Sequence, residues 1–406
     1  MMQNRRNLVV TAVAMAIALA YGPAGAAGKY DPGASDTEIK IGNTNPYSGP
    51  ASAYGTIGKA IAAYWKMVND NGGINGRKIN FISLDDSYSP PKTVEQTRKL
   101  VEQERVLLDF QPLGTPTNTA IHKYMNAKKV PQLFVATGAG KWGQPKKYPW
   151  TMGWQPAYPG EAKIYASYLL NNKPDAKVAI LYQNDDYGKD YLNGFIAGLG
   201  AKAKTMIVAK ESYETSDPTV DPQVIKLKAS GADVFFNITT PKFAAQAIRK
   251  VYDLGWQPLH FLNNVSTSVG GVLKPAGLEK SVGLITTAYL KEATDPQWAN
   301  DADMKAWNAW MDKYLPGGDK SSSFNVYGYA VSATMHEVLK RAGDNLTRAN
   351  IMKQAASLKG LKVPLLLPGI TVDTSPTDFY PIECARLAKF DGHKWQLVGD
   401  VLCPKK

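Results

Sequence analysis

The chain has 406 residues, of which 44% are hydrophobic and 20% are charged, a composition typical of globular proteins and not of disordered ones. Its formal net charge is +12 at pH 7, but the Lys and Arg residues are scattered and usually stand near an Asp or Glu. We therefore expect a solvated basic surface and no nucleic-acid partner.

The first predicted element is a signal peptide over residues 1–27. Arg5 and Arg6 precede an apolar run over 8–20, and small residues follow with an Ala-x-Ala-like cleavage site. The run is shorter than the roughly 20 residues that cross a bilayer, and no later run is comparably long and uncharged. The arginine pair lacks the rest of a twin-arginine motif, which favours the general secretion route. We expect a periplasmic protein with about 380 mature residues, enough for two domains.

Strand-like and helix-like segments alternate from Glu38 onwards. Short apolar runs predict strands, helical spacing of apolar residues predicts the helices between them, and Asn71-Gly72-Gly73 ends the first helix. The predicted strands are 39–43, 78–84, 106–110 and 132–136, and the predicted helices are 57–68, 91–104 and 117–128.

A second run of the same kind follows a Pro-, Trp- and Tyr-rich segment over 145–159, which we expect to be the first hinge. Such repeated units predict two α/β lobes, each with a mostly parallel sheet between helices. The predicted strands are 178–182, 206–209, 234–238, 259–262 and 284–287, the predicted helices are 158–171, 190–199, 222–230, 243–254, 299–314 and 325–341, and a strand-rich tail is expected over 365–402.

Three patterns that could indicate chemistry are better explained without it. Residues 138–143 match G-x-G-x-x-G, but Pro145 and Pro149 follow where a dinucleotide-binding loop must open a helix, so we expect a loop. The four histidines form no metal-ligand spacing, and no P-loop or G-x-S-x-G elbow occurs. The pairs at 85–86 and 185–186 are interpreted as loop and capping carboxylates, because adjacent residues of an extended chain point to opposite sides. We expect no enzyme activity, no metal and no cofactor.

Both cysteines, Cys384 and Cys403, lie near the end of the chain. An oxidising compartment allows them to form a disulfide, and the alternative is a pair of buried thiols.

Two small-residue segments follow predicted strands, at the edge where open α/β sheets place their ligands. Residues 112–118 read Pro-Leu-Gly-Thr-Pro-Thr-Asn and precede a helix, and residues 136–138 read Ala-Thr-Gly. Glycine permits close approach of the backbone, hydroxyls donate hydrogen bonds, and a helix N-terminus offers free N–H groups to an anion. The segments therefore suggest a neutral carboxylate cradle, although simple N-capping by Thr115 or Thr117 explains them equally well.

Several stretches resemble the periplasmic leucine/isoleucine/valine-type binding proteins of ABC importers. The resemblance rests on residues 39–50, 54–55, 68–79 and 84–86, and in the second half on Asp-Asp-Tyr-Gly, Gly-Ala-Asp-Val and Tyr-Asp-Leu-Gly, so it covers nearly the whole mature chain. It implies the type I periplasmic binding fold, with two doubly wound lobes joined by three hinge crossovers that close over a ligand. The implied N-terminal lobe comprises 28–156 and 288–376, and the C-terminal lobe comprises 157–287 and 377–406.

The resemblance also implies a set of contacts in the cleft. The carboxylate loop and the neighbouring strand end belong to the first lobe, one tyrosine forms the wall beside them, and residues after second-lobe strands face them. Core packing is the alternative explanation for each aromatic residue. The residues expected at the ligand are Tyr54, Leu113, Gly114, Thr115, Thr117, Ala136, Thr137, Gly138, Tyr158, Tyr187, Thr239 and Asn264.

One departure from the family concerns the ligand. Amino-acid binders place an acid after a second-lobe strand, where this chain has Asn263, Asn264 and Val265. Burying a ligand ammonium without a counter-charge is costly, so an amino acid is disfavoured unless another acid reaches in. We expect a benzoate- or cinnamate-like carboxylate, with branched-chain or other apolar amino acids as the alternative.

The expected function is solute capture for an ABC permease in the inner membrane, with a small organic carboxylate as ligand and a monomeric protein. A ligand sensor of the same fold is the second possibility, and an enzyme on an α/β scaffold is the third.

Overall fold

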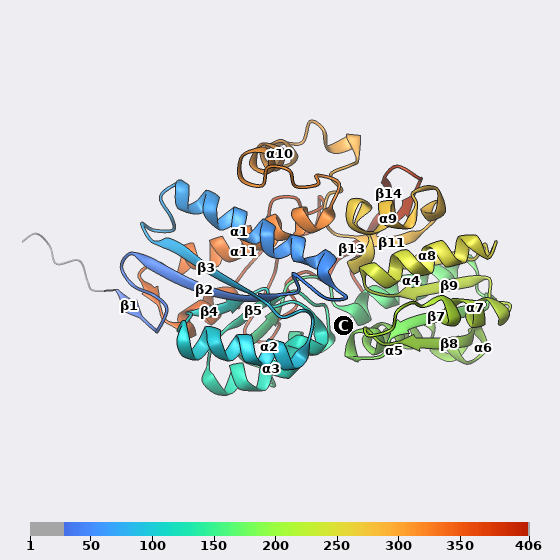
Figure 1. Ribbon diagram of the computed structural model, residues 1–406, viewed down its shortest axis with the longest axis horizontal. Helices are drawn as coiled ribbons and strands as arrows, with labels where there is room; N and C mark the ends of the chain where they lie inside the picture. Colours follow the sequence, from blue (N-terminus) through green and yellow to red (C-terminus); the bar gives the residue numbers. More distant parts are fainter. Residues whose placement is uncertain (1–27, 405–406) are drawn as a thin grey trace, which may run out of the picture.

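The molecule is built on two separate sheets, which Figure 1 shows at opposite ends of its long axis. The computed structural model describes residues 28–404, so the predicted signal peptide over 1–27 lies outside the described residues.

The first sheet has the strand order β3-β2-β4-β5-β6, and every pair of neighbouring strands is parallel. Helices α1 and α11 lie over one face, and α2 and α3 lie over the other (Figure 1). Ile57, Ile61, Trp65 and Val68 are buried along one stripe of α1, the pattern of an amphipathic helix. The elements are β2 (Glu38–Asn45), α1 (Gly55–Asp70), β3 (Lys78–Asp85), α2 (Pro90–Arg98), β4 (Leu108–Phe110), α3 (Thr115–Lys128), β5 (Gln132–Val135) and β6 (Thr151–Gly153).

The second sheet has the order β14-β13-β11-β10-β9-β7-β8, with an antiparallel hairpin of β13 and β14 on an otherwise parallel sheet. Alternate residues of β7 pack to opposite faces, since Val178 and Ile180 join the core under α4 and α5, whereas Ala179 and Leu181 join the core under α7 and α8. The elements are α4 (Tyr158–Asn172), β7 (Val178–Gln183), α5 (Asp186–Leu199), α6 (Ala203–Met206), β8 (Ile207–Tyr213), α7 (Asp221–Ala229), β9 (Val234–Ile238), α8 (Pro241–Asp253), β10 (Leu259–Leu262), α9 (Lys274–Ala276), β11 (Ile285–Ala288), β13 (Ala385–Phe390) and β14 (Trp395–Leu402).

The chain passes between the two lobes three times: after β6, after β11 and before β13. Between the last two passages it forms α10 (Ala302–Tyr314), α11 (Ser323–Ala342) and α12 (Arg348–Ala355), and α11 packs against α1. A small parallel pair of β1 (Lys29–Tyr30) and β12 (Asn345–Leu346) completes this lobe. The exact division at 28–156 with 288–376, and 157–287 with 377–406, stays a prediction.

The tail differs from the expected strand-rich segment over 365–402. Its strands begin only at Ala385, and the preceding residues make isolated bridges such as Leu361 with Val372 and Leu290 with Leu366. The leucines at 365–367 are buried because this irregular segment packs on the core, not because it enters a sheet. Helix α12 was not expected; it begins at Arg348, and the hydroxyl of the N-cap residue Thr347 accepts a hydrogen bond from the Asn350 N–H.

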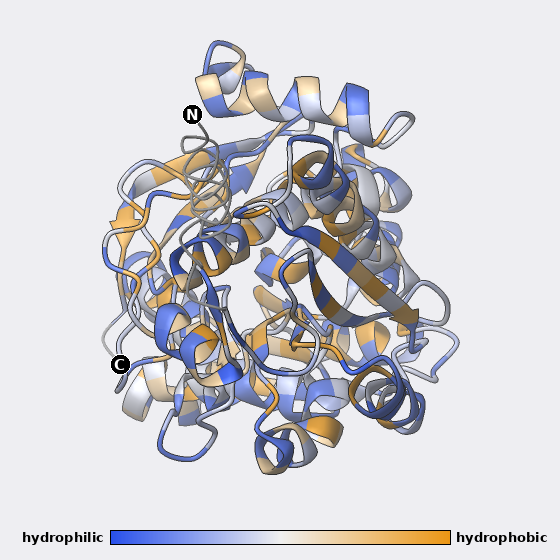
Figure 2. Cartoon of the chain, turned by 90° about the vertical axis from the view of Figure 1, so that its left-hand side faces the viewer, coloured by the Kyte–Doolittle hydropathy of each residue, from blue (hydrophilic) through white to orange (hydrophobic). Residues whose placement is uncertain are grey.

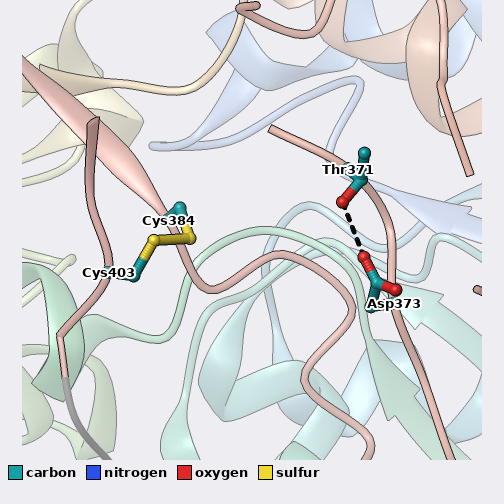
Figure 3. The surroundings of a disulfide bond; sticks show 4 residues. All are labelled: Thr371, Asp373, Cys384 and Cys403. Atoms are coloured by element: carbon teal, nitrogen blue, oxygen red, sulfur yellow. Dashed lines mark hydrogen bonds between the residues drawn. A yellow bond between two sulfur atoms is a disulfide. The ribbon is translucent and has the colours of Figure 1, made fainter. Parts of the chain in front are cut away.

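A disulfide joins Cys384, just before β13, to Cys403, just after β14, and so links the open end of this hairpin (Figure 3). Hydrophobic and hydrophilic residues alternate around the outer helices (Figure 2). Across residues 28–404, no helix is both long enough and apolar enough to cross a membrane. In the same part of the chain, no three His, Cys, Asp or Glu side chains form a group suited to a metal ion.

Candidate ligand-binding cleft

A cleft with about 1060 Å³ of empty space, counted to its open mouth, lies between the two lobes. Segments that follow β3, β4 and β5 line it from the first lobe, and segments that follow β7, β9, β10 and β11 line it from the second. Carboxyl ends of parallel strands therefore face each other across the cleft, the arrangement in which open α/β sheets bind ligands.

The start of α3 forms the centre of the first-lobe wall. Gly114 has a φ of 101°, and a Cβ there would lie 2.4 Å from the Tyr88 ring and 2.7 Å from the Thr117 hydroxyl oxygen, so only glycine fits. The first N–H groups of a helix have no intrahelical acceptor, and Pro116 has no N–H to offer. The N–H groups of Thr115 and Thr117 are thus the donors that this helix end presents to an anion.

Leu113, Gly114, Thr115 and Ala136 line the cleft together. Leu113 and Ala136 pair in parallel, and the Gly114 N–H donates to the Ala136 carbonyl at 3.3 Å, so the two expected loops do lie side by side. The Thr115 and Thr137 hydroxyl oxygens are 2.5 Å apart, which orients the Thr115 hydroxyl at the cleft surface.

Three further predicted residues of this lobe lie behind the lining. The Thr117 hydroxyl donates to the carbonyls of Leu113 and Gly114, so it is turned to the backbone. Thr137 supports Thr115, and Gly138 accepts a hydrogen bond from the Tyr158 N–H at 2.7 Å. A Cβ on Gly138 would lie 2.4 Å from the Pro156 carbonyl oxygen, so glycine permits the close approach of the hinge.

The backbone under this wall is strained. Gln111 and Phe134 are buried non-glycine residues with φ values of 61° and 54°, and the register of β5 shifts between Leu133 and Val135. The Gln111 side-chain amide donates to the Phe134 carbonyl and joins the two distortions. Such bulges redirect the end of a strand, and backbone strain of this kind clusters at functional sites.

Tyrosines dominate the opposite wall. Asp185 caps α5 by accepting from the N–H groups of Tyr187 and Gly188, which confirms its interpretation as a capping carboxylate and holds Tyr187 at the helix start. The Tyr187 hydroxyl is buried and has no hydrogen-bond partner among the described residues. Its ring contacts Tyr158 edge to face, and Tyr158 stacks on Tyr191. Burial raises the pKa of Tyr187 well above its usual value, so the phenol is a neutral donor.

Of the remaining predicted residues of the second lobe, one lines the cleft and one lies behind its surface. Asn264 lines the cleft, as does Thr240, whereas the Thr239 hydroxyl donates to the Asn237 side chain at 2.6 Å and lies behind the surface. Of the twelve expected residues, those that line the cleft are Tyr54, Leu113, Gly114, Thr115, Ala136, Tyr158, Tyr187 and Asn264.

Other lining residues were missed. Tyr88 follows β3 and Tyr289 follows β11. Both could have been predicted, because open α/β sheets bind ligands at the carboxyl ends of their strands. Tyr327 and Phe324 come from α11, and their helical spacing is that of any buried helix face. No local signal distinguishes them, because they reach the cleft only through the packing of α11 on α1.

The two lobes touch across the cleft, so the structure is in a closed arrangement. The Tyr54 hydroxyl donates to the Val265 carbonyl at 3.0 Å. On one side the Gly270 N–H donates to the Ser321 carbonyl at 2.9 Å. On the other side Lys141 and Asp186 form an ion pair at 2.7 Å, which is partly exposed and contributes little energy.

The acidic side chains near the cleft stand at positions that the family resemblance did not imply. No carboxylate stands at 263–265, but Glu161 lies beneath Asn264 and accepts from its N–H and from the hydroxyls of Tyr165 and Tyr191. Glu161 is therefore satisfied internally, and it does not line the cleft. Glu292 and Asp295 do line it, so other acids reach the cleft although none stands at 263–265.

The family model described as periplasmic binding protein matches residues 38–394. Among its relatives, a Leu/Ile/Val-binding protein homologue from Brucella melitensis is 25% identical over 337 residues, which cover 79% of this chain and 83% of the relative. An amino acid binding protein from Pseudomonas aeruginosa is 22% identical, with 76% and 80% covered.

Solved structures show the same architecture. A substrate-binding periplasmic protein from Ralstonia solanacearum superimposes with a TM-score of 0.81 and 22% identity, covering 89% of this chain and all of the other. A branched-chain amino acid ABC transporter protein from Thermus thermophilus with bound valine gives 0.81 at 15% identity, covering 90% and 97%. A fatty acid ABC transporter substrate-binding protein from Thermomonospora curvata gives 0.77 at 19% identity, covering 93% and 95%. These matches confirm the predicted fold of two doubly wound lobes with three crossovers.

Proposed function

Because the chain belongs to the periplasmic binding protein family, and is thus a substrate-binding protein of the ABC-transporter type, we propose that it captures an aromatic carboxylate between its two lobes. The observation that carries this proposal is the pairing of an uncharged anion cradle with a wall of tyrosines. Thr115 and the start of α3 supply donors to a carboxylate, while Tyr54, Tyr158 and Tyr187 supply flat apolar surface. Aromatic rings pack edge to face or offset against such side chains.

A second candidate ligand is a branched-chain or other apolar amino acid. The names of the Brucella and Thermus relatives favour it, and Glu292 in the cleft provides an acid that an ammonium group requires.

The biological setting follows from the family and stays part of the proposal. Residues 1–27 act as a signal peptide, the mature protein is a periplasmic monomer, and its partner is an ABC permease of the inner membrane. The relatives are binding proteins, which supports reversible binding without chemical turnover. A sensor that uses the same ligand cleft would share every feature of this site.

A ligand panel tests the proposal. We expect benzoate and cinnamate to raise the melting temperature of the mature protein and to be recovered unchanged after incubation. Calorimetry with leucine and valine is the matched comparison. Stabilisation by leucine with no response to any aromatic acid would replace the proposed ligand by the amino acid, and chemical conversion of the bound compound would contradict a binding function.

A further inference from the structure

The cleft continues well beyond the tyrosine wall. Its distal end is lined by Lys291, Glu292, Asp295, Trp298, Trp395 and Leu397. Tyr187 follows β7, whereas Glu292 follows β11, three strand positions away in the second sheet. At about 4.8 Å per strand, these two strands are roughly 14 Å apart. A ligand that reaches from the cradle to the distal end is therefore elongated.

At the distal end, the lysines form ion pairs with Asp residues, whereas Glu292 has no cationic partner among the described residues. The Lys291 ammonium lies 2.7 Å from Asp301 and 3.3 Å from Asp303, and the Lys394 ammonium lies 2.7 Å from Asp295. Both nearby lysines thus serve other carboxylates. Glu292 forms no salt bridge within residues 28–404, and its carboxylate accepts from the N–H and hydroxyl of Thr294, at 3.3 and 3.4 Å, and from the backbone N–H of Ala293.

Glu292 is thus a carboxyl group without a counter-ion on the surface of a binding cleft. Burial raises its pKa to about 7, and the charge of Asp295 acts in the same direction. A neighbouring cation favours the charged form of a carboxyl group. The Trp298 ring at this end of the cleft contacts a cation, because the Lys291 ammonium lies 5.3 Å from its centre.

We propose that Glu292 is a specificity-determining residue of a second polar subsite, and that it pairs with a primary amine at the end of the ligand remote from the carboxylate. This inference rests on the proposed function, because it assumes that a carboxylate occupies the cradle at Thr115. The ligand class becomes an elongated aromatic amino carboxylate. It combines a carboxylate for the cradle at Thr115 with an ammonium for Glu292.

Matched benzoates test the subsite directly. Each para-aminoalkyl benzoate, with one, two or three methylene groups before the amine, is compared by calorimetry with the para-alkyl benzoate in which a methyl group replaces the ammonium. We expect at least one amine to bind the wild-type protein tenfold or more tightly than its alkyl partner. Glu292→Gln should abolish that preference while changing the affinity for the alkyl benzoate less than about threefold.

The control is Glu279→Gln, which removes the same charge from an exposed position outside the cleft; we expect it to retain the preference. Melting curves of both variants establish that they are folded. If alkyl benzoates bind and no amine is preferred, or if Glu292→Gln keeps the preference, the inference is wrong and the proposed function stands. If no benzoate of either series binds, both are wrong.

Discussion

At the scale of single residues, Asp109 is a buried carboxyl group of the first lobe whose protonation is coupled to folding. It lies at the centre of β4, buried, and neither carboxylate oxygen has a hydrogen-bond partner among the described residues. Burial raises its pKa to about 7, and the negative charge of Asp86 adds to the effect. Burial also raises the pKa of Asp86 to about 6.

These carboxyl groups make stability depend on pH. The pKa of Asp109 is higher in the folded protein than the unfolded value of 3.8, so the folded state binds a proton that the unfolded state releases. The stability that this proton contributes is therefore lost as the pH rises from about 4 through 7. Between pH 5 and 8 we expect a loss of about 2–3 kcal/mol in the free energy of unfolding. Asp109→Asn should flatten this slope in urea titrations.

The exposed Asp175 provides the comparison, since its side chain is 97% accessible. Asp175→Asn should leave the pH profile unchanged. An Asp109→Asn protein that loses stability with pH as steeply as wild type would show that another group is responsible.

We expect the Thr115 side chain to contribute directly to ligand binding. Its hydroxyl lies at the cleft surface beside Thr137, whereas that of Thr117 is engaged by backbone carbonyls. Thr115→Ala should weaken benzoate binding by about 1–3 kcal/mol, the range for a lost hydrogen bond to a charged group, measured by calorimetry. Thr117→Ala should act mainly on the stability of α3.

Thr205→Ala, an exposed threonine of the second lobe, is the control for these two variants and should change neither quantity. Equal affinities of wild type and Thr115→Ala would place the carboxylate elsewhere in the cleft.

At the scale of elements, the β13–β14 hairpin supports the distal end of the cleft, because Trp395 and Leu397 line it from β14. The Cys384–Cys403 disulfide closes this hairpin over a sequence separation of 19 residues. Chain-entropy arguments give about 3 kcal/mol for a loop of this size. We expect Cys384→Ser with Cys403→Ser to lower the free energy of unfolding by up to that amount in denaturant titrations.

Reducing agent supplies the matched experiment, since it should destabilise the wild-type protein and leave the double variant unaffected. A wild-type protein insensitive to reduction under unfolding conditions would argue against the bond.

At the scale of the whole molecule, the contacts between the lobes select the closed state. Gly270 donates to Ser321 across the cleft, and a Cβ at Gly270 would lie 2.1 Å from the Asp319 carboxylate and 2.6 Å from the Ser321 hydroxyl. Gly270→Val should therefore hinder closure without disturbing either core. We expect ligand affinity to fall roughly tenfold, because a less populated closed state binds proportionally more weakly.

Small-angle scattering measures closure as the decrease in the radius of gyration when ligand is added. We expect this decrease to be smaller for Gly270→Val than for the wild-type protein. Ala201→Val, an exposed position on the second lobe, adds the same bulk away from the cleft and should close normally. Full compaction of Gly270→Val with ligand would show that this contact is dispensable.

Much of the fold was predictable because local patterns are strong in parallel sheets. β9 and β10 have the predicted bounds, since strands covered on both faces are short apolar runs between turns. Helix α12 was missed because only three of its eight residues are buried, which gives a weak apolar pattern. The tail over 365–384 was misassigned because its leucines are buried by packing on the core, and burial alone does not specify a strand.

The sequence by itself determined the two-lobed fold and the part of the cleft next to strand ends, including Thr115 and Tyr187, because strand ends and helix starts are local features that a parallel sheet brings to one edge. Only the tertiary structure decided which hydroxyls reach the cleft surface, and that Tyr327, Glu292 and Trp395 also line the cleft. These residues come from a helix, a hinge segment and an edge strand that reach the cleft by packing of distant segments, and no local spacing encodes that contact.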